Sequence, residues 1–255
     1  MLERISIEDR GHLRLIGLNR PEKMNAADEQ MLSELSLAYG QAHEDDNIRA
    51  VVVHAHGDHF TAGLDLNDVG PKMATGKLTM VPDGGLDPWG ISTEQISKPV
   101  VMAIKGNCFT LGTELALASE VVVASNDAVF GQLEVSRGIL PFGGGTIRMP
   151  RAAGWTNAMR YLLTGELFSA ETAKSMNIVT EIDDDPLAKA IEIAEKIAAQ
   201  APLAVQQTLE SSRNSIEGDE ERMLMRRLEN LMMTQDVQRG MEAFISKQPA
   251  KFEGN

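Results

Sequence analysis

With 255 residues, 43% of them hydrophobic, the chain can bury a large core, as one large domain or as a domain with an appendage. A formal net charge of -13 excludes nucleic acid and anionic membranes as default partners, because both need a positive surface. A single cysteine, Cys108, excludes an intrachain disulfide, and neither a signal peptide nor a membrane-spanning apolar run is recognisable. We therefore expect a cytoplasmic globular protein.

The first part of the chain alternates strand and helix patterns. Alternation of apolar residues with period two predicts short strands at 5–7 and 13–15. An amphipathic helix is predicted over about 28–43, and the β-branched run at 50–55 predicts a buried strand. The segment from Asn67 to Gly90 lacks periodicity and is predicted to be a long loop, either a lid that faces substrate or a disordered segment.

The same alternation continues through the middle of the chain. A second buried strand is predicted over 99–106, followed by a glycine turn and a helix that carries Glu114 in its first turn. Two more short strands are predicted over 121–125 and 128–132. Repeated alternation of this kind predicts an α/β fold with helices packed on sheets.

Strand patterns stop after about Asp183. The remainder is predicted to be helical to about Lys247, with breaks at Gly218 and near Gln235. We expect residues 1–184 to form the core with the substrate site, and 185–255 to form a helical region used for packing and oligomerisation.

Two acids, Glu114 and Glu134, stand twenty residues apart in glycine-bearing segments. If two carboxyls meet in a buried site, burial and mutual repulsion hold one ionised and the other protonated, which supplies a base and an acid near neutral pH. Each has an ordinary structural explanation as well. Glu114 fits a helix N-terminus and Glu134 a strand end, so spacing alone does not decide their role.

A histidine-rich run competes as a functional motif. Residues 54–59 read HAHGDH, which resembles the ligand spacing of metallo-β-lactamase-like hydrolases, and imidazoles after a strand are good zinc ligands. Such sites need further histidines from later in the chain, yet the only others are His12 and His43. We interpret the run as a polar turn and expect no metal site.

Four segments in order, NRPEKMNA (19–26), FTAGLDL (60–66), KPVVMAIKGNCFTLGTELALAS (98–119) and FGQLEVSRGILPFGGGTIRMPRAAG (130–154), resemble the enoyl-CoA hydratase/isomerase, or crotonase, superfamily. The resemblance implies a spiral of repeated ββα units with a helical C-terminal part, and a homotrimer or dimer of trimers. It implies an acyl-CoA substrate and no cofactor, since coenzyme A is part of the substrate.

The resemblance also implies roles for particular residues. Glu114 and Glu134 correspond to the two catalytic acids, and the backbone N–H groups of Leu64 and Leu111 to the oxyanion hole. Contacts to the substrate and its CoA moiety are implied for Lys23, Met24, Ala62, Asp65, Leu66, Asn67, Gly112 and Lys247.

One departure from the family pattern lies in the oxyanion-hole turn. Many relatives carry glycine where this chain has Thr110 and Leu111, and the Leu111 side chain stands beside the thioester, which leaves the shape of the acyl group open. Retention of both acids favours a hydratase, a hydro-lyase that adds water reversibly to a trans-2-enoyl-CoA. The alternatives are an isomerase using Glu134 alone, other acyl-CoA enolate chemistry, a catalytically silent acyl-CoA-binding protein and, least favoured, a metallohydrolase.

Overall fold

The computed structural model describes residues 2–216, 229, 231–248 and 250. The predicted helix break at Gly218 lies outside them. None of the described helices is long and apolar enough to cross a membrane.

The elements follow one another in an alternating order. The first are β1 (Ile5–Arg10), β2 (Leu13–Leu18), η1 (Pro21–Lys23), α1 (Glu29–Glu44), β3 (Ala50–Ala55) and α2 (Leu66–Ala74). The middle of the chain forms β4 (Val100–Ile104), β5 (Asn107–Phe109), α3 (Leu111–Ala118), β6 (Val121–Ala124), β7 (Val129–Gly131) and η2 (Glu134–Arg137). The last are α4 (Gly145–Ala153), α5 (Trp155–Thr164), β8 (Phe168–Ser169), α6 (Ala170–Ser175), β9 (Glu181–Ile182), α7 (Pro186–Ala198), α8 (Pro202–Ile216) and α10 (Gln235–Ser246).

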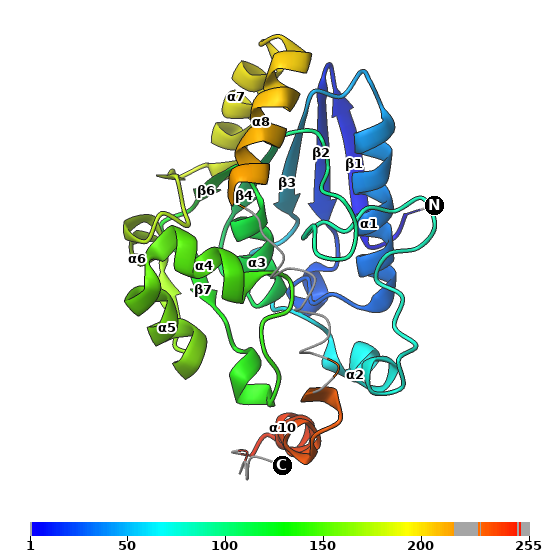
Figure 1. The fold of residues 1–255 in the computed structure, drawn as a ribbon, viewed down its shortest axis with the longest axis vertical. Coiled ribbons are helices and arrows are strands. Elements are labelled where there is room, and N and C mark those ends of the chain that lie inside the picture. The colour runs from blue at the N-terminus through cyan, green and yellow to red at the C-terminus, as the bar shows by residue number, and fades with distance from the viewer. Residues whose placement is uncertain (1, 217–228, 230, 249, 251–255) are drawn as a thin grey trace.

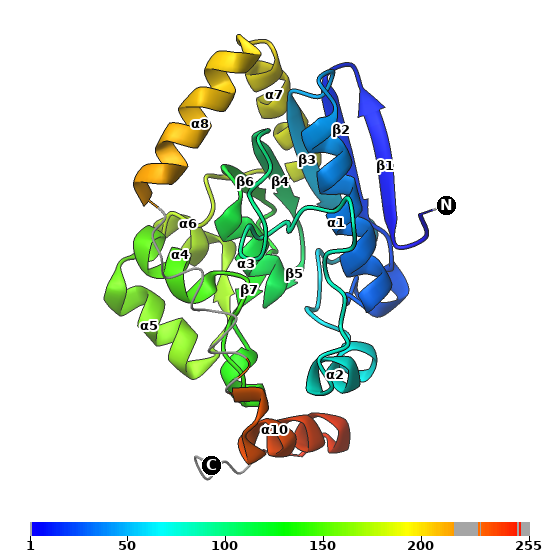
Figure 2. The ribbon, with the colours of Figure 1, turned by 45° about the vertical axis from the view of Figure 1, so that its right-hand side comes forward.

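The strands form two separate sheets. The larger has the order β1-β2-β3-β4-β6-β9, antiparallel at β1 and β2 and parallel from β2 onward, and the smaller has the order β5-β7-β8. From β4 onward the chain passes from one sheet to the other, β4 to β5 and then β6 to β7, with helix α3 between the pairs (Figure 2). This is the predicted spiral of ββα units, and the α/β fold class is confirmed.

The larger sheet is buried on both faces in its centre. In β3 the side chains of Val51 and Val53 enter the main core, which includes apolar residues of α1, whereas Ala50 and Val52 face a second cluster that includes Ala190 of α7. Because successive side chains of a strand point to opposite faces, a run of small β-branched residues suits a strand covered on both sides. Figure 1 shows α7 and α8 beside the sheet and α10 at the far end of the molecule.

The prediction of an unstructured segment from Asn67 to Gly90 is wrong at its start, where α2 occupies Leu66–Ala74. Pro71 lies inside this helix, and proline weakens a helical pattern in the sequence. Contacts from elsewhere hold the helix in place. Lys72 bridges Asp68 at 2.8 Å and Glu29 of α1 at 2.9 Å, and Val69 is fully buried.

The last described helix meets the segment η2 at unusually short range. A Cβ added to Gly240 of α10 would overlap the carbonyl oxygen of Arg137, and one added to Gly138 would lie 2.6 Å from the carbonyl oxygen of Asp236. The guanidinium of Arg137 also lies 5.0 Å from the ring centre of Phe244, a cation–π contact. The two glycines therefore let α10 pack backbone against backbone on the turn that carries Glu134.

Candidate active site

The turn into α3 has a backbone conformation that glycine normally supplies. Thr110, its N-cap residue, has φ 51° and ψ -114°, and the hydroxyl of Thr110 is buried without a hydrogen-bond partner among the described residues. A Cβ on Gly63 would overlap that hydroxyl, so the two turns touch here. Leu111 follows as the first residue of α3, and its N–H is one of those at a helix start that have no intrahelical acceptor.

A second backbone donor comes from the neighbouring turn. The N–H groups of Ala62, Gly63 and Asp65 bind Met24 O, Thr61 Oγ1 and Ala27 O respectively. The N–H of Leu64, between them, bonds to none of the described residues. Leu64 and Leu111 line the same cavity, so both predicted oxyanion-hole residues border one space.

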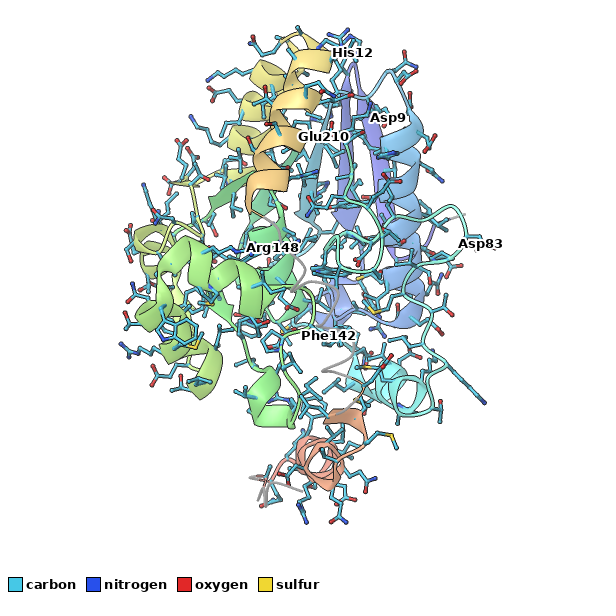
Figure 3. All side chains as sticks on the ribbon, in the orientation of Figure 1. Asp9, His12, Asp83, Phe142, Arg148 and Glu210 are labelled. Carbon is cyan, nitrogen blue, oxygen red and sulfur yellow. The ribbon has the colours of Figure 1, made fainter. Side chains whose placement is uncertain are left out.

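Glu114 sits one turn into α3 and is only 2% exposed. Its Oε1 accepts a hydrogen bond of 2.9 Å from the N–H of Gly145, the first residue of α4. Burial raises the pKa of the carboxyl to about 7, while the N–H groups of Gly145 and Gly143 and the positive charge of Arg148 oppose that rise. Figure 3 shows Arg148 on α4 and Phe142 on the segment before it. A helix start is a favourable place for a carboxylate, so the start of α4 offsets part of the cost of burying an ionised Glu114.

Glu134 begins η2 and is 4% exposed. Burial, followed by the nearby charge of Glu114, raises the pKa of the Glu134 carboxyl well above its ordinary value. The amide of Gln132, itself fully buried, faces this carboxyl. With its oxygen on that side it can accept the proton of a neutral Glu134, whereas with its nitrogen there it would donate to an ionised Glu134 at 2.9 and 3.0 Å. Two buried carboxyls so close together do not both ionise readily, and the raised pKa favours the protonated form of Glu134.

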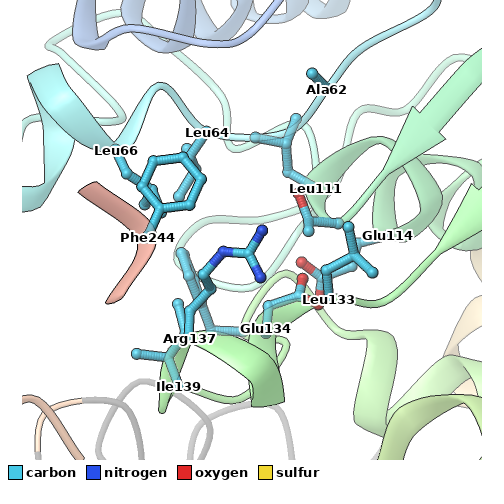
Figure 4. Close-up of a pocket in the computed structure, with 12 residues that line it drawn as sticks. Ala62, Leu64, Leu66, Leu111, Glu114, Leu133, Glu134, Arg137, Ile139 and Phe244 are labelled. Atoms are coloured by element: carbon cyan, nitrogen blue, oxygen red, sulfur yellow. The ribbon is translucent and has the colours of Figure 1, made fainter. Parts of the chain in front are cut away.

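A cavity of about 80 Å³ brings these groups together (Figure 4). It is lined by Ala62, Leu64, Leu66, Thr110, Leu111, Glu114, Leu133, Glu134, Arg137, Ile139, Phe142 and Phe244. In Figure 4 the side chains of Glu114 and Glu134 approach each other on one side of the space, and the guanidinium of Arg137 projects into it. A second cavity continues from Glu114 on the side of the loop between α2 and β4.

The residues predicted to contact substrate lie at varying distances from this cavity. Ala62 and Leu66 line it directly, and Asn67 and Lys247 line an adjoining groove that also contains Arg137 and Phe244. The structure therefore brings α2 and α10, which are far apart in the sequence, to the same opening.

The other four are not part of the cavity wall. The carboxylate of Asp65 is paired with Arg20 at 2.8 Å. Gly112 is buried in α3, where a Cβ would overlap Thr61. Lys23 and Met24 form the exposed end of η1, and Met24 has a left-handed φ of 50°.

Arg137, Phe244 and Trp89 are among the site residues that were not predicted from the sequence. Trp89 lies within the irregular loop, is 3% exposed and donates a hydrogen bond of 2.9 Å from its indole nitrogen to Leu111 O. A large aromatic residue in a segment rich in glycine and proline is a signal that could have identified it. Arg137 and Phe244 are 107 positions apart in the chain (244 − 137), and no local pattern connects them.

The histidine run does not form a cluster of ligands. Among the described residues, no three or more His, Cys, Asp or Glu side chains are grouped so as to hold a metal ion. His56 Nε2 lies 2.7 Å from Ser6 Oγ, and His59 Nδ1 accepts the N–H of Asn107 at 3.1 Å. The two imidazoles thus serve different local contacts.

Comparison with known proteins agrees with the geometry. The model of the enoyl-CoA hydratase/isomerase family matches residues 8–255, and the chain belongs to this family. A 2,3-dehydroadipyl-CoA hydratase of Escherichia coli is 33% identical over 94% of both chains. An enoyl-CoA hydratase of Mycobacterium tuberculosis is 31% identical over 97% of this chain and 95% of the relative.

Solved structures show the same fold. A probable enoyl-CoA hydratase/isomerase from Mycobacterium abscessus superposes with a TM-score of 0.82 at 45% identity, with all of both chains covered. A carnitinyl-CoA hydratase from Mycobacterium avium gives a TM-score of 0.87 at 28% identity over 99% of both chains.

Proposed function

We propose that the protein is an enoyl-CoA hydratase that adds water reversibly to a trans-2-enoyl-CoA. The observation that carries the proposal is the pair of buried carboxyls, Glu114 and Glu134, in one cavity with the backbone donors of Leu64 and Leu111. The hydratase names of the relatives, at about a third identity, support the same reaction class.

The backbone donors would stabilise the enolate. Addition of water at Cβ of a conjugated thioester moves negative charge onto the thioester oxygen, and N–H groups already aimed at that oxygen lower the barrier. Loss of one such donor typically costs about 10² to 10³ in rate. Leu64 and Leu111 supply these groups from the main chain, so their side chains are free to shape the pocket.

The two acids would divide the proton transfers. Glu114, in its ionised form and oriented by the N–H of Gly145, takes a proton from water as the hydroxyl oxygen bonds to Cβ. Glu134, which keeps its proton, delivers it to Cα, and the enolate returns to a thioester. One O–H bond and the C=C π bond are lost, and a C–O bond and a C–H bond are formed. Each positioned acid or base typically contributes about 10² to 10⁴ in rate.

The remaining assignments are part of the same proposal. Lys23 and Lys247 are cations suited to the phosphates of CoA, and the reaction needs no metal or redox cofactor because coenzyme A belongs to the substrate. We further propose a homotrimer or dimer of trimers in the cytoplasm, with the C-terminal helical region, residues 185–255, contributing to assembly. Light scattering after gel filtration measures that mass directly.

A panel of enoyl-CoA thioesters tests the reaction. Loss of the conjugated thioester absorbance is followed for the wild type, Glu114→Gln and Glu134→Gln, and the product is identified by mass as substrate plus water. Each substitution is expected to lower kcat by about 10² to 10⁴. Glu44→Gln is the matched control, because that side chain is 84% exposed at the end of α1.

The result also separates the alternatives. Wild-type turnover that both substitutions leave intact contradicts the proposal. A product of unchanged mass, lost only in Glu134→Gln, points to an isomerase. Tight binding of acyl-CoA without any turnover points to a silent binding protein.

A further inference from the structure

Two cavities flank the predicted oxyanion hole. The cavity that contains both glutamates and the second cavity share four lining residues, Leu64, Leu111, Glu114 and Phe142. A thioester whose oxygen lies at the two N–H groups is therefore placed at the junction. One arm of the substrate enters each cavity, and the charges of the walls decide which arm goes where.

The cavity with both glutamates leads toward positive charge. Arg137 projects into it and stacks on Phe244 (Figure 4). Both side chains also border the adjoining groove, where Lys247 lies. The CoA arm carries phosphates and must reach solvent, so this is the side on which it is stabilised.

The second cavity offers an anionic group no cation among the described residues that line it. Among its described lining residues, the charged side chains are Asp87 and Glu114, both acids. The Asp87 carboxylate is already occupied, because it accepts the N–H groups of Trp89 at 3.0 Å, Ile91 at 2.9 Å and Ser92 at 2.8 Å. It organises the loop and is only 6% exposed.

The walls of the second cavity are mostly apolar. Leu78, Met80, Val81 and Ile91 come from the loop region, and Phe142 comes from the segment before α4. The Trp89 ring forms one side of the second cavity, and the indole N–H, its only polar group, donates a hydrogen bond to Leu111 O. Gly143 permits this arrangement, because a Cβ there would lie 2.9 Å from Trp89 Cδ1 and 2.8 Å from Glu114 Oε2.

We propose that the second cavity takes the acyl chain and selects uncharged, apolar chains longer than four carbons, rejecting chains that end in a carboxylate. The inference rests on the proposed function in one respect, that the thioester sits at Leu64 and Leu111. Each buried methylene strengthens binding about fourfold, until the space is filled. A terminal carboxylate buried without a cation loses its hydration with no compensation.

The binding of saturated acyl-CoAs tests this proposal without any turnover. The result can therefore be interpreted even if the protein is not a hydratase. Calorimetry with butyryl-, hexanoyl- and octanoyl-CoA is expected to show a Kd that falls with length, by up to about fourfold per methylene. Adipyl-CoA is expected to bind at least tenfold more weakly than hexanoyl-CoA, which has the same number of acyl carbons. A Kd independent of length, or adipyl-CoA binding as tightly as hexanoyl-CoA, overturns the proposal.

Two variants, one in each cavity, show which cavity holds the acyl chain of the substrate. Ile91→Trp fills the second cavity and is expected to abolish the length dependence, whereas Ile139→Trp fills the other cavity and is expected to weaken all acyl-CoAs and free CoA by similar factors. The reverse pattern overturns the proposal. Met80→Phe, a smaller change in the same wall as Ile91, replaces Ile91→Trp if thermal unfolding shows that the latter does not fold.

Discussion

The carboxylate of Glu114 is tied to the N–H of Gly145 by a hydrogen bond of 2.9 Å, so a side chain of α3 is anchored at the first residue of α4. Glu134 lies beside the charge of Glu114, and only its own N–H and the charge of Arg137 oppose the rise in its pKa. The two acids thus differ in their surroundings rather than in their chemistry, and this difference is the basis on which we propose Glu114 as the base and Glu134 as the acid.

The pH dependence of catalysis follows from that difference. Activity is expected to rise with pH as Glu114 ionises, with an apparent pKa of about 7, and to fall at higher pH as Glu134 loses the proton that it must donate. The pair titrates as a unit, so kcat/KM against pH reports two values that belong to both groups. A rate that is flat from pH 5 to pH 9 contradicts these roles.

Gly143→Ala is expected to damage the site more than the fold. The new methyl would press on both Glu114 Oε2 and Trp89 Cδ1, displacing the base and one wall of the second cavity. We expect a loss of about 10² or more in kcat/KM, because small displacements of a catalytic group are costly, and a loss of about 1 to 3 kcal/mol in the free energy of unfolding.

Gly76→Ala is the control for that substitution. Gly76 has φ 64° with open space around it, so alanine strains the backbone there without touching the site. We expect lower stability by about 1 kcal/mol and unchanged kcat/KM. Equal kinetic effects of the two substitutions would show that Gly143→Ala acts through general destabilisation.

Thr110→Gly is expected to stabilise the protein. Threonine at φ 51° and ψ -114° is strained, and its buried hydroxyl lacks a partner among the described residues. Glycine removes both the backbone strain and the unpaired hydroxyl, although it also makes the unfolded chain more flexible. We expect the free energy of unfolding to rise by about 1 kcal/mol. Urea unfolding measures the change. Thr110→Val, which removes the hydroxyl and keeps the strain, shows how much each cost contributes; a loss of stability in Thr110→Gly contradicts the assignment of strain.

The stability of the fold should also depend on Glu134 and pH. Burial raises the pKa of this carboxyl above the ordinary 4.5, so the folded state binds the proton more tightly than the unfolded state does. The favourable contribution is complete below the unfolded pKa and is lost as pH rises through the folded pKa. Glu134→Gln is therefore expected to raise Tm relative to wild type more at pH 8.5 than at pH 5. The exposed control Glu44→Gln should show no such difference between the two pH values.

Local patterns predict the parts of this molecule that depend on local chemistry. The central strands and α1 lie within one or two residues of the predicted bounds, because a β-branched run or an amphipathic face needs few distant contacts to be recognised. Glu114 and Glu134 were singled out because each lies in a distinctive glycine-bearing segment, and the structure brings them into one cavity.

Features that depend on distant contacts were not predicted. The irregular loop is organised by Asp87, whose carboxylate accepts hydrogen bonds from three backbone N–H groups of the loop. The composition of the loop does not indicate that role. The position of Trp89 against Leu111 O and that of Arg137 against Phe244 require the fold itself. Helix α2 was not predicted, because its internal proline weakens the helical pattern in the sequence. The stabilising contact from α1 is visible only in the structure.

The close approach of Gly138 and Gly240 has a practical consequence for protein engineering. Because the backbones of η2 and α10 touch without intervening side chains, an insertion or a shift in either one is transmitted to the turn that holds Glu134. A truncation that removes α10, or a fusion placed just before it, is therefore expected to displace Glu134 and the proposed active site. Affinity tags and reporter domains on this protein belong at the N-terminal end of the chain, where β1 forms an edge of the larger sheet.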